Sequence, residues 1–67
     1  MIEIKVNGRS EQIQSEMSVK QLLDTVEVPP NYLAVEVNGD VVPRESYADK
    51  IVGAGDEVEV VTLVGGG

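Results

Sequence analysis

Two Asn-Gly dipeptides, each following an alternating run of apolar side chains, constrain the fold of this chain more than any other feature. In the first run, Met1–Asn7, apolar and charged residues alternate with a period of two, which predicts a half-buried strand. Asn and Gly both accept positive φ, so Asn7-Gly8 predicts a tight hairpin turn. The second strand, Arg9–Gln14, is polar except for Ile13 and suits the edge of a sheet.

The second Asn-Gly dipeptide predicts another hairpin in the middle of the chain. Tyr32–Asn38 is expected to be a strand whose inward face carries the apolar residues Leu33, Val35 and Val37. Asn38-Gly39 predicts the turn, and Val41-Val42 a short return strand that Pro43 ends.

A helix is predicted between these hairpins, beginning after Ser18. Ser18 followed by Gln21 forms a capping box, and Met17 with Leu22 forms a hydrophobic staple. An apolar stripe follows at helical spacing, formed by Val19, Leu22, Leu23 and Val26. Pro29 and Pro30 cannot continue a helix, so it should end by about Glu27.

The rest of the chain completes one α+β layer structure. Arg44–Lys50 is expected to hold a short helical turn, with Ile51 and Val52 as core residues beneath it. After a turn at residues 53–56, Glu57–Val64 is the last strand. Pairing the first and last strands in parallel at the centre of a mixed four- to five-stranded sheet, with the helix across one face, buries the predicted apolar stripes. We therefore expect one domain at 1–64 and a flexible glycine tail at 65–67.

Composition excludes several function classes. The 67 residues contain no Cys and no His. A stand-alone enzyme is therefore nearly excluded, and no metal site is expected. Acidic residues such as Asp56, Glu57 and Glu59 are expected to be solvated strand and turn edges. The net charge of -7 disfavours binding to nucleic acid or to an anionic membrane surface. It is expected either to suit a basic partner or only to keep the chain soluble. Without a signal-peptide pattern or an apolar run long enough to span a bilayer, cytoplasmic residence is expected.

The glycine tail is the candidate reactive segment. Gly65-Gly66-Gly67 carries no side-chain bulk and, when extended, reaches about 10 Å, enough to enter a narrow tunnel in a partner enzyme. The Gly67 carboxylate becomes an electrophile only when activated, usually by adenylation with Mg²⁺ stabilising the phosphate charge. Since the chain has no Cys, any sulfur it carries must be a thiocarboxylate on Gly67. The alternative is a flexible tail with no chemistry.

Three segments of the chain resemble the ThiS family of thiamine-biosynthesis sulfur carriers, within the ubiquitin-like ThiS/MoaD group. They are residues 34–44 (AVEVNGDVVPR), 55–61 (GDEVEVV) and 64–67 (VGGG), and the resemblance extends over essentially the whole chain. It implies a β-grasp fold like that of ubiquitin. It also implies that an E1-like enzyme, ThiF, uses ATP to adenylate Gly67. A cysteine desulfurase then supplies sulfur, and the thiazole synthase ThiG uses the thiocarboxylate. Gly66 corresponds to the threading residue, and Gly65 adds flexibility.

The predicted register also suggests a partner-binding face. If Val58 and Val60 face the helix, then Glu59, Val61 and Leu63 face the opposite way. The neighbouring strand contributes Ala34 and Glu36 to that opposite face, giving an apolar spot with an acidic rim beside the tail. The alternative is an ordinary half-apolar sheet surface. Arg44 is expected to be a surface charge, with pairing to a partner carboxylate as the other possibility.

Two other functions remain open at this point. A MoaD-like carrier that delivers sulfur for molybdopterin synthesis shares the fold, the tail and the activation. The segment from Asn38 to Arg44 favours the thiamine carrier. A ubiquitin-like interaction module without covalent chemistry differs from both, because its terminal carboxylate would never be activated.

Overall fold

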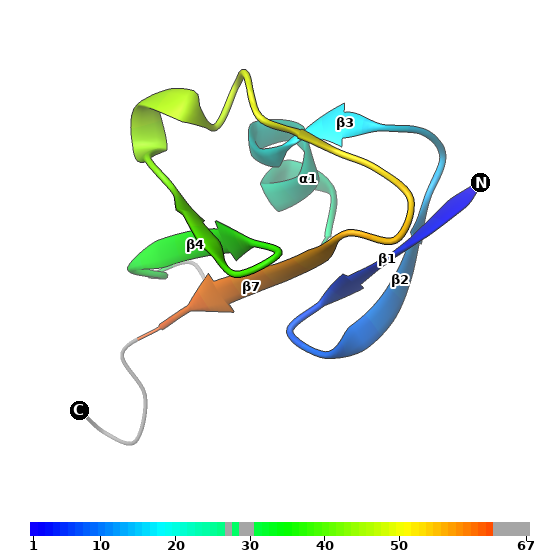
Figure 1. Cartoon of the computed structure of the whole chain (residues 1–67), viewed down its shortest axis with the longest axis horizontal. Helices are drawn as coiled ribbons and strands as arrows, with labels where there is room; N and C mark the ends of the chain where they lie inside the picture. Colours follow the sequence, from blue (N-terminus) through cyan, green and yellow to red (C-terminus); the bar gives the residue numbers. More distant parts are fainter. Residues whose placement is uncertain (27, 29–30, 63–67) are drawn as a thin grey trace.

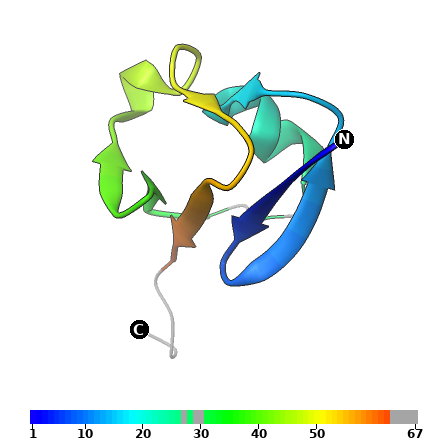
Figure 2. The ribbon, with the colours of Figure 1, turned by 45° about the vertical axis from the view of Figure 1, so that its right-hand side comes forward.

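One helix packs across a five-stranded mixed sheet (Figure 1). The computed structural model describes residues 1–26, 28 and 31–62. The sheet has the strand order β2-β1-β7-β4-β5. Its strands are β1 (Ile2–Val6), β2 (Arg9–Ile13), β4 (Ala34–Val37), β5 (Asp40–Val42) and β7 (Glu57–Val61). The helix, α1 (Val19–Thr25), lies with β3 (Met17–Ser18) on one side of β1 and β7 (Figure 2). This arrangement confirms the predicted β-grasp class.

Both Asn-Gly turns form as predicted and join antiparallel strands. Asn7 and Gly8 have φ values of 53° and 81°, and Asn38 and Gly39 have values of 53° and 87°. These positive angles match the twist of the flanking strands. The first turn joins β1 to β2, an edge strand, and the second joins β4 to β5 at the opposite edge.

The last strand occupies the centre of the sheet, as expected. β7 runs parallel to β1 over the pairs Lys5–Glu57 and Val6–Val58. On its other side β7 pairs with β4 in antiparallel register over four residue pairs, from Ala34–Val61 to Val37–Val58. Two elements from opposite halves of the chain therefore hold β7 from both sides.

The capping box at the start of α1 is confirmed. The Gln21 amide donates to Ser18 Oγ at 3.1 Å, and the Ser18 amide donates to Gln21 Oε1 at 3.0 Å. The next two free amides, those of Val19 and Lys20, donate to the carbonyls of Lys50 and Tyr47. The helix start is thus tied to the connection between β5 and β7, which satisfies donors that a helix alone leaves unpaired.

The core between α1 and the sheet is aliphatic apart from Tyr47. Its buried members are Ile4, Val6, Ile13, Val19, Leu22, Val35, Val37, Val42, Tyr47, Val52, Val58 and Val60. Leu23 and Val26, which were predicted for the apolar stripe, are only partly buried, and Val26 lies beyond the end of α1 at Thr25. Met17, the predicted staple residue, is also partly buried against this core.

Two predicted core residues are exposed. Leu33 is 55% exposed, because β4 begins at Ala34 and Leu33 precedes the alternating part of the strand. Ile51 is 51% exposed, because it lies in β6 (Ile51–Val52), where alternation turns only Val52 inward. β6 also pairs with β3 in a second, two-stranded sheet, which no sequence pattern predicted.

The short helical turn predicted in residues 44–50 forms as a 3-10 turn, η1 (Arg44–Ser46), and Tyr47 follows it. Burial raises the pKa of the Tyr47 hydroxyl, which has no hydrogen-bond partner within the described part of the chain. Arg44 is more than a surface charge: its guanidinium lies 5.3 Å from the ring centroid of Tyr32 and Nη2 donates to the Tyr32 carbonyl at 3.3 Å. These contacts connect η1 to the segment that leads into β4.

Candidate functional site

The candidate site is the end of β7 together with the sheet face that points away from α1. Val58 and Val60 are buried beneath the helix, and Glu57, Glu59 and Val61 face the opposite side. Four predicted site residues, Leu63, Gly65, Gly66 and Gly67, lie outside the described residues. The structure thus describes β7, the strand from which the chain continues toward Gly67.

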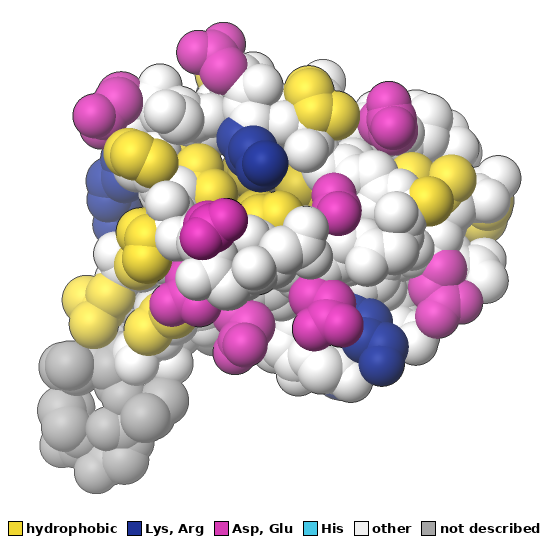
Figure 3. Space-filling model, in the orientation of Figure 1, with side chains coloured by type: hydrophobic (Ala, Val, Ile, Leu, Met, Phe, Trp, Pro, Cys, Tyr) yellow, Lys and Arg dark blue, Asp and Glu magenta, His cyan; other side chains and the backbone are white. Residues whose placement is uncertain are grey.

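An apolar spot lies beside the end of β7, where hydrophobic side chains gather at one edge of the molecule (Figure 3). Val61 is 37% exposed and pairs across the strands with Ala34, which is half-buried. Leu33 and Val41 are also exposed nearby, on the segment before β4 and on β5. The predicted positions of Val61 and Ala34 on the open face are therefore correct, and sequence reasoning missed Leu33 and Val41 as further exposed apolar residues.

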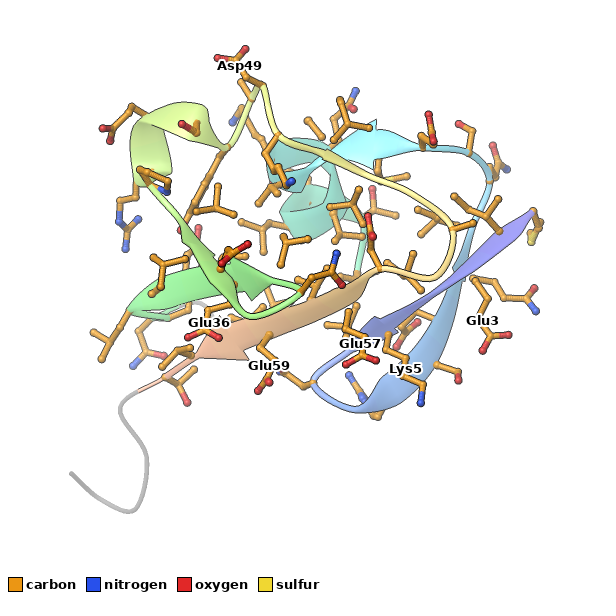
Figure 4. The ribbon with its side chains drawn as sticks, viewed as in Figure 1. Glu3, Lys5, Glu36, Asp49, Glu57 and Glu59 are labelled. Carbon is orange, nitrogen blue, oxygen red and sulfur yellow. The ribbon has the colours of Figure 1, made fainter. Side chains whose placement is uncertain are left out.

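Acidic side chains adjoin this spot. Glu36 and Glu59 lie directly opposite each other on β4 and β7, and Figure 4 shows both on the side of the sheet away from α1. Glu57, Lys5 and Glu3 continue the row across β7 and β1 (Figure 4). Like charges directly opposite each other on adjacent strands repel. The face therefore offers negative potential beside apolar surface, a combination that suits a partner with a basic rim.

Asp56 is the exception among the acidic residues expected to be solvated. Its carboxylate accepts hydrogen bonds from the Gly53 amide at 2.9 Å and from Asn38 Nδ2 at 3.0 Å. These two bonds stabilise the charged form and lower the pKa of Asp56 below its usual value. Asp56 therefore closes the turn before β7 and links it to the second Asn-Gly turn.

Surface hollows of about 370 and 330 Å³ lie away from the end of β7. The larger one lies at the start of β7, against Glu3, Lys5 and Gly55, at the far end of that strand from Val61. The second lies between α1 and η1. No group of three or more His, Cys, Asp or Glu in residues 1–26, 28 and 31–62 is placed to hold a metal ion. No helix among those residues has the length and apolar character to cross a membrane.

Comparison with known proteins agrees with this geometry. The family model described as "ThiS family" matches residues 3–67. The crystal structure of the thiamine biosynthesis protein (ThiS) from Geobacter metallireducens superposes with a TM-score of 0.83 at 33% identity, covering 98% of this chain and 100% of that one. The sulfur carrier protein ThiS of Escherichia coli K12 is 29% identical, with 98% of this chain and 100% of that protein covered.

A further relative is the thiazole synthase of Paramagnetospirillum magneticum, 36% identical over 66 residues. The match covers 98% of this chain and only 20% of that protein, so the chain spans about a fifth of that relative's length. The family model, the Escherichia coli ThiS protein and the Geobacter ThiS structure each match nearly all of this chain. This chain therefore belongs to the ThiS family of sulfur carriers.

Proposed function

We propose that this protein carries sulfur as a thiocarboxylate on Gly67 and donates it for thiazole formation in thiamine biosynthesis. The observation that carries the proposal is membership of the ThiS family over residues 3–67, which include the terminal glycines. The similarity to a thiazole synthase supports the thiamine pathway over molybdopterin synthesis, because a domain like this chain forms part of that enzyme.

The proposed chemistry needs two partner-catalysed steps. An E1-like enzyme of the ThiF kind binds ATP and Mg²⁺, and an oxygen of the Gly67 carboxylate attacks the α-phosphorus and releases pyrophosphate. The terminal sulfur of a persulfide, formed by a cysteine desulfurase, then attacks the acyl carbon, and AMP leaves. A thiol reduces the resulting acyl disulfide and so releases the Gly67 thiocarboxylate. The chain itself supplies the carboxylate and a surface for the partners. A thiazole synthase of the ThiG kind is the proposed acceptor of the sulfur.

The open sheet face is the proposed surface for the activating enzyme. Val61 and Ala34 would form the apolar contact together with Leu63, and Glu59 and Glu36 would pair with basic side chains of the partner. Two properties support this: the face lies beside the strand that continues to Gly67, and its charge is complementary to a basic surface. Opposite charges across an interface accelerate encounter and select the partner.

Intact-mass spectrometry tests the chemistry directly. The chain is incubated with ATP, Mg²⁺, a thiol reductant, a cysteine desulfurase with cysteine and the candidate E1-like enzyme. We expect a mass gain equal to the exchange of one oxygen for sulfur. A variant lacking Gly67 is the control, and circular dichroism should show it folded as the full chain is. A chain that never gains this mass is a non-covalent module, and a gain that persists without Gly67 refutes the assigned position.

A complementation experiment separates the two carrier pathways. The gene is introduced into cells that lack their own thiamine sulfur carrier and, separately, into cells that lack the molybdopterin carrier. Growth without thiazole in the first strain alone supports the proposal. Restoration of molybdopterin synthesis alone assigns the chain to the MoaD-like class.

A further inference from the structure

The two Asn-Gly turns flank β7 and bind it at opposite ends through their side chains. Asn38 Oδ1 accepts a hydrogen bond from the Glu57 amide at 3.0 Å, where β7 begins. Asn7 Oδ1 accepts one from the Val60 amide at 2.8 Å, next to the last residue of β7. Each Asn thus has a role besides allowing the positive φ of its turn.

The Asn7 bond lies where backbone pairing on that side of β7 runs out. β1 ends at Val6, and the Asn7 amide still donates to the Val58 carbonyl at 2.9 Å before the chain turns. Beyond this point β1 has no further residue to pair with β7. The Asn7 side chain supplies the next acceptor, and the buried Val60 would otherwise have an amide without a partner among the described residues.

The other side of β7 is held independently. β4 pairs with β7 as far as Val61, and the Leu33 amide donates to the Val61 carbonyl at 2.7 Å. The end of β7 is therefore fixed by a backbone ladder on the β4 side and by one side chain on the β1 side. Loss of that side chain leaves Val60 and Val61 attached through β4 alone.

We propose that Asn7 is a positioning residue for the C-terminal chemistry: its Oδ1 atom fixes the end of β7 and so orients the segment that continues to Gly67. This inference rests on the proposed carrier function. A partner that binds a strand end already held in place does not have to order it, and ordering costs affinity. Without the Asn7 bond that cost falls on the binding step, so KM rises and kcat is retained.

Substitution by glycine isolates the side chain. Asn7 has φ 53°, a conformation that glycine adopts without strain, so N7G removes the Oδ1 acceptor and keeps the turn. N7D keeps an oxygen acceptor at the same place and serves as the rescue variant. N38G is the control at the other turn: it makes the same substitution at the same φ and removes the side-chain bonds of Asn38 to the Glu57 amide and to Asp56.

Two measurements test the proposal with full-length chains. Amide hydrogen exchange at Val60 should accelerate in N7G and remain slow in N7D and N38G. Pyrophosphate release by the E1-like enzyme should show kcat/KM lowered about fivefold in N7G through KM, the effect of losing one neutral hydrogen bond. N7D and N38G should have KM values near that of the unmodified chain, even though N38G is less stable.

The outcomes separate the inference from the function on which it rests. If the unmodified chain releases no pyrophosphate with any E1-like enzyme, the proposed function fails and this role fails with it. If the unmodified chain reacts and N7G has the same KM, only the role of Asn7 is refuted. An equal rise of KM in N7G and N38G also refutes it, because the effect would then follow stability rather than the end of β7.

Discussion

Removal of the Asp56 carboxylate is the perturbation whose effect the structure determines most closely. Asp56 accepts hydrogen bonds from the half-buried Gly53 amide and from the side chain of Asn38, and Asn38 in turn accepts from the Glu57 amide. Asp56→Ala deletes both acceptors at once. The loop before β7 would then lose its link to the β4–β5 turn.

The expected magnitude follows from those two bonds. A hydrogen bond to a charged group contributes about 1.5–3 kcal/mol. The Asn38 amide is exposed and regains water, so most of the loss comes from Gly53. We therefore expect Asp56→Ala to lower the free energy of unfolding by about 2 kcal/mol, or Tm by roughly 8–16 °C for a domain of this size.

The loss of stability caused by Asp56→Ala should be smaller at acidic pH than at pH 7. The pKa of Asp56 is lowered in the folded protein, so its contribution is complete above the pKa of an unfolded Asp, about 3.9. That contribution disappears as pH falls through the lower, folded pKa. The difference in stability between the unmodified chain and Asp56→Ala should thus be constant from pH 7 to about 5 and shrink at more acidic pH.

Urea unfolding followed by circular dichroism from pH 7 to 2 measures this difference. Asp49→Ala is the control, since Asp49 is exposed and lies far from the sheet face that carries the labelled glutamates in Figure 4. It changes the net charge of -7 by the same amount, so it corrects for relief of overall repulsion. Equal unfolding free energies for the two variants at pH 7 would refute the argument, as would a difference that grows toward acidic pH.

Four further substitutions test the core and the open face. Val61→Asp should weaken binding to the activating enzyme by about tenfold or more and change the free energy of unfolding by only about 0.5 kcal/mol. Calorimetric titration measures the binding and thermal melts the stability. A large loss of stability would instead mean that Val61 is a core residue. Leu22→Ala should lower the free energy of unfolding by about 2–5 kcal/mol, because Leu22 is fully buried, and Leu23→Ala should lower it clearly less. Similar urea midpoints for these two variants would contradict the packing of α1. Tyr47→Phe should be neutral or stabilising at pH 7, because it removes a buried hydroxyl without a partner among the described residues. The pKa of Tyr47 is raised by burial, so the unmodified chain should lose stability above about pH 10 and Tyr47→Phe should lose less; identical alkaline unfolding curves would refute the burial of the hydroxyl.

Local sequence signals predicted the elements well where the physical cause is local. Asn7-Gly8 and Asn38-Gly39 form their turns because both residues accept positive φ. Ser18 and Gln21 form the capping box because they lie only three positions apart. The prediction for Leu33 was wrong because alternation alone does not show that β4 begins at Ala34. The prediction for Ile51 was wrong because in the two-residue strand β6 alternation turns only Val52 inward.

The family resemblance, the terminal glycines and the absence of Cys determine the proposed chemistry, and all three can be read from the sequence alone. Only the tertiary structure decides how the strand leading to Gly67 is held. The Asn7–Val60 bond joins residues 53 positions apart, and the bond between Asn38 and Glu57 joins residues 19 apart. Neither bond follows from a sequence pattern, because each arises only once β7 lies between the two hairpins. The same Asn side chains that mark the turns in the sequence therefore have a second role, binding the central strand, which they acquire only through the fold.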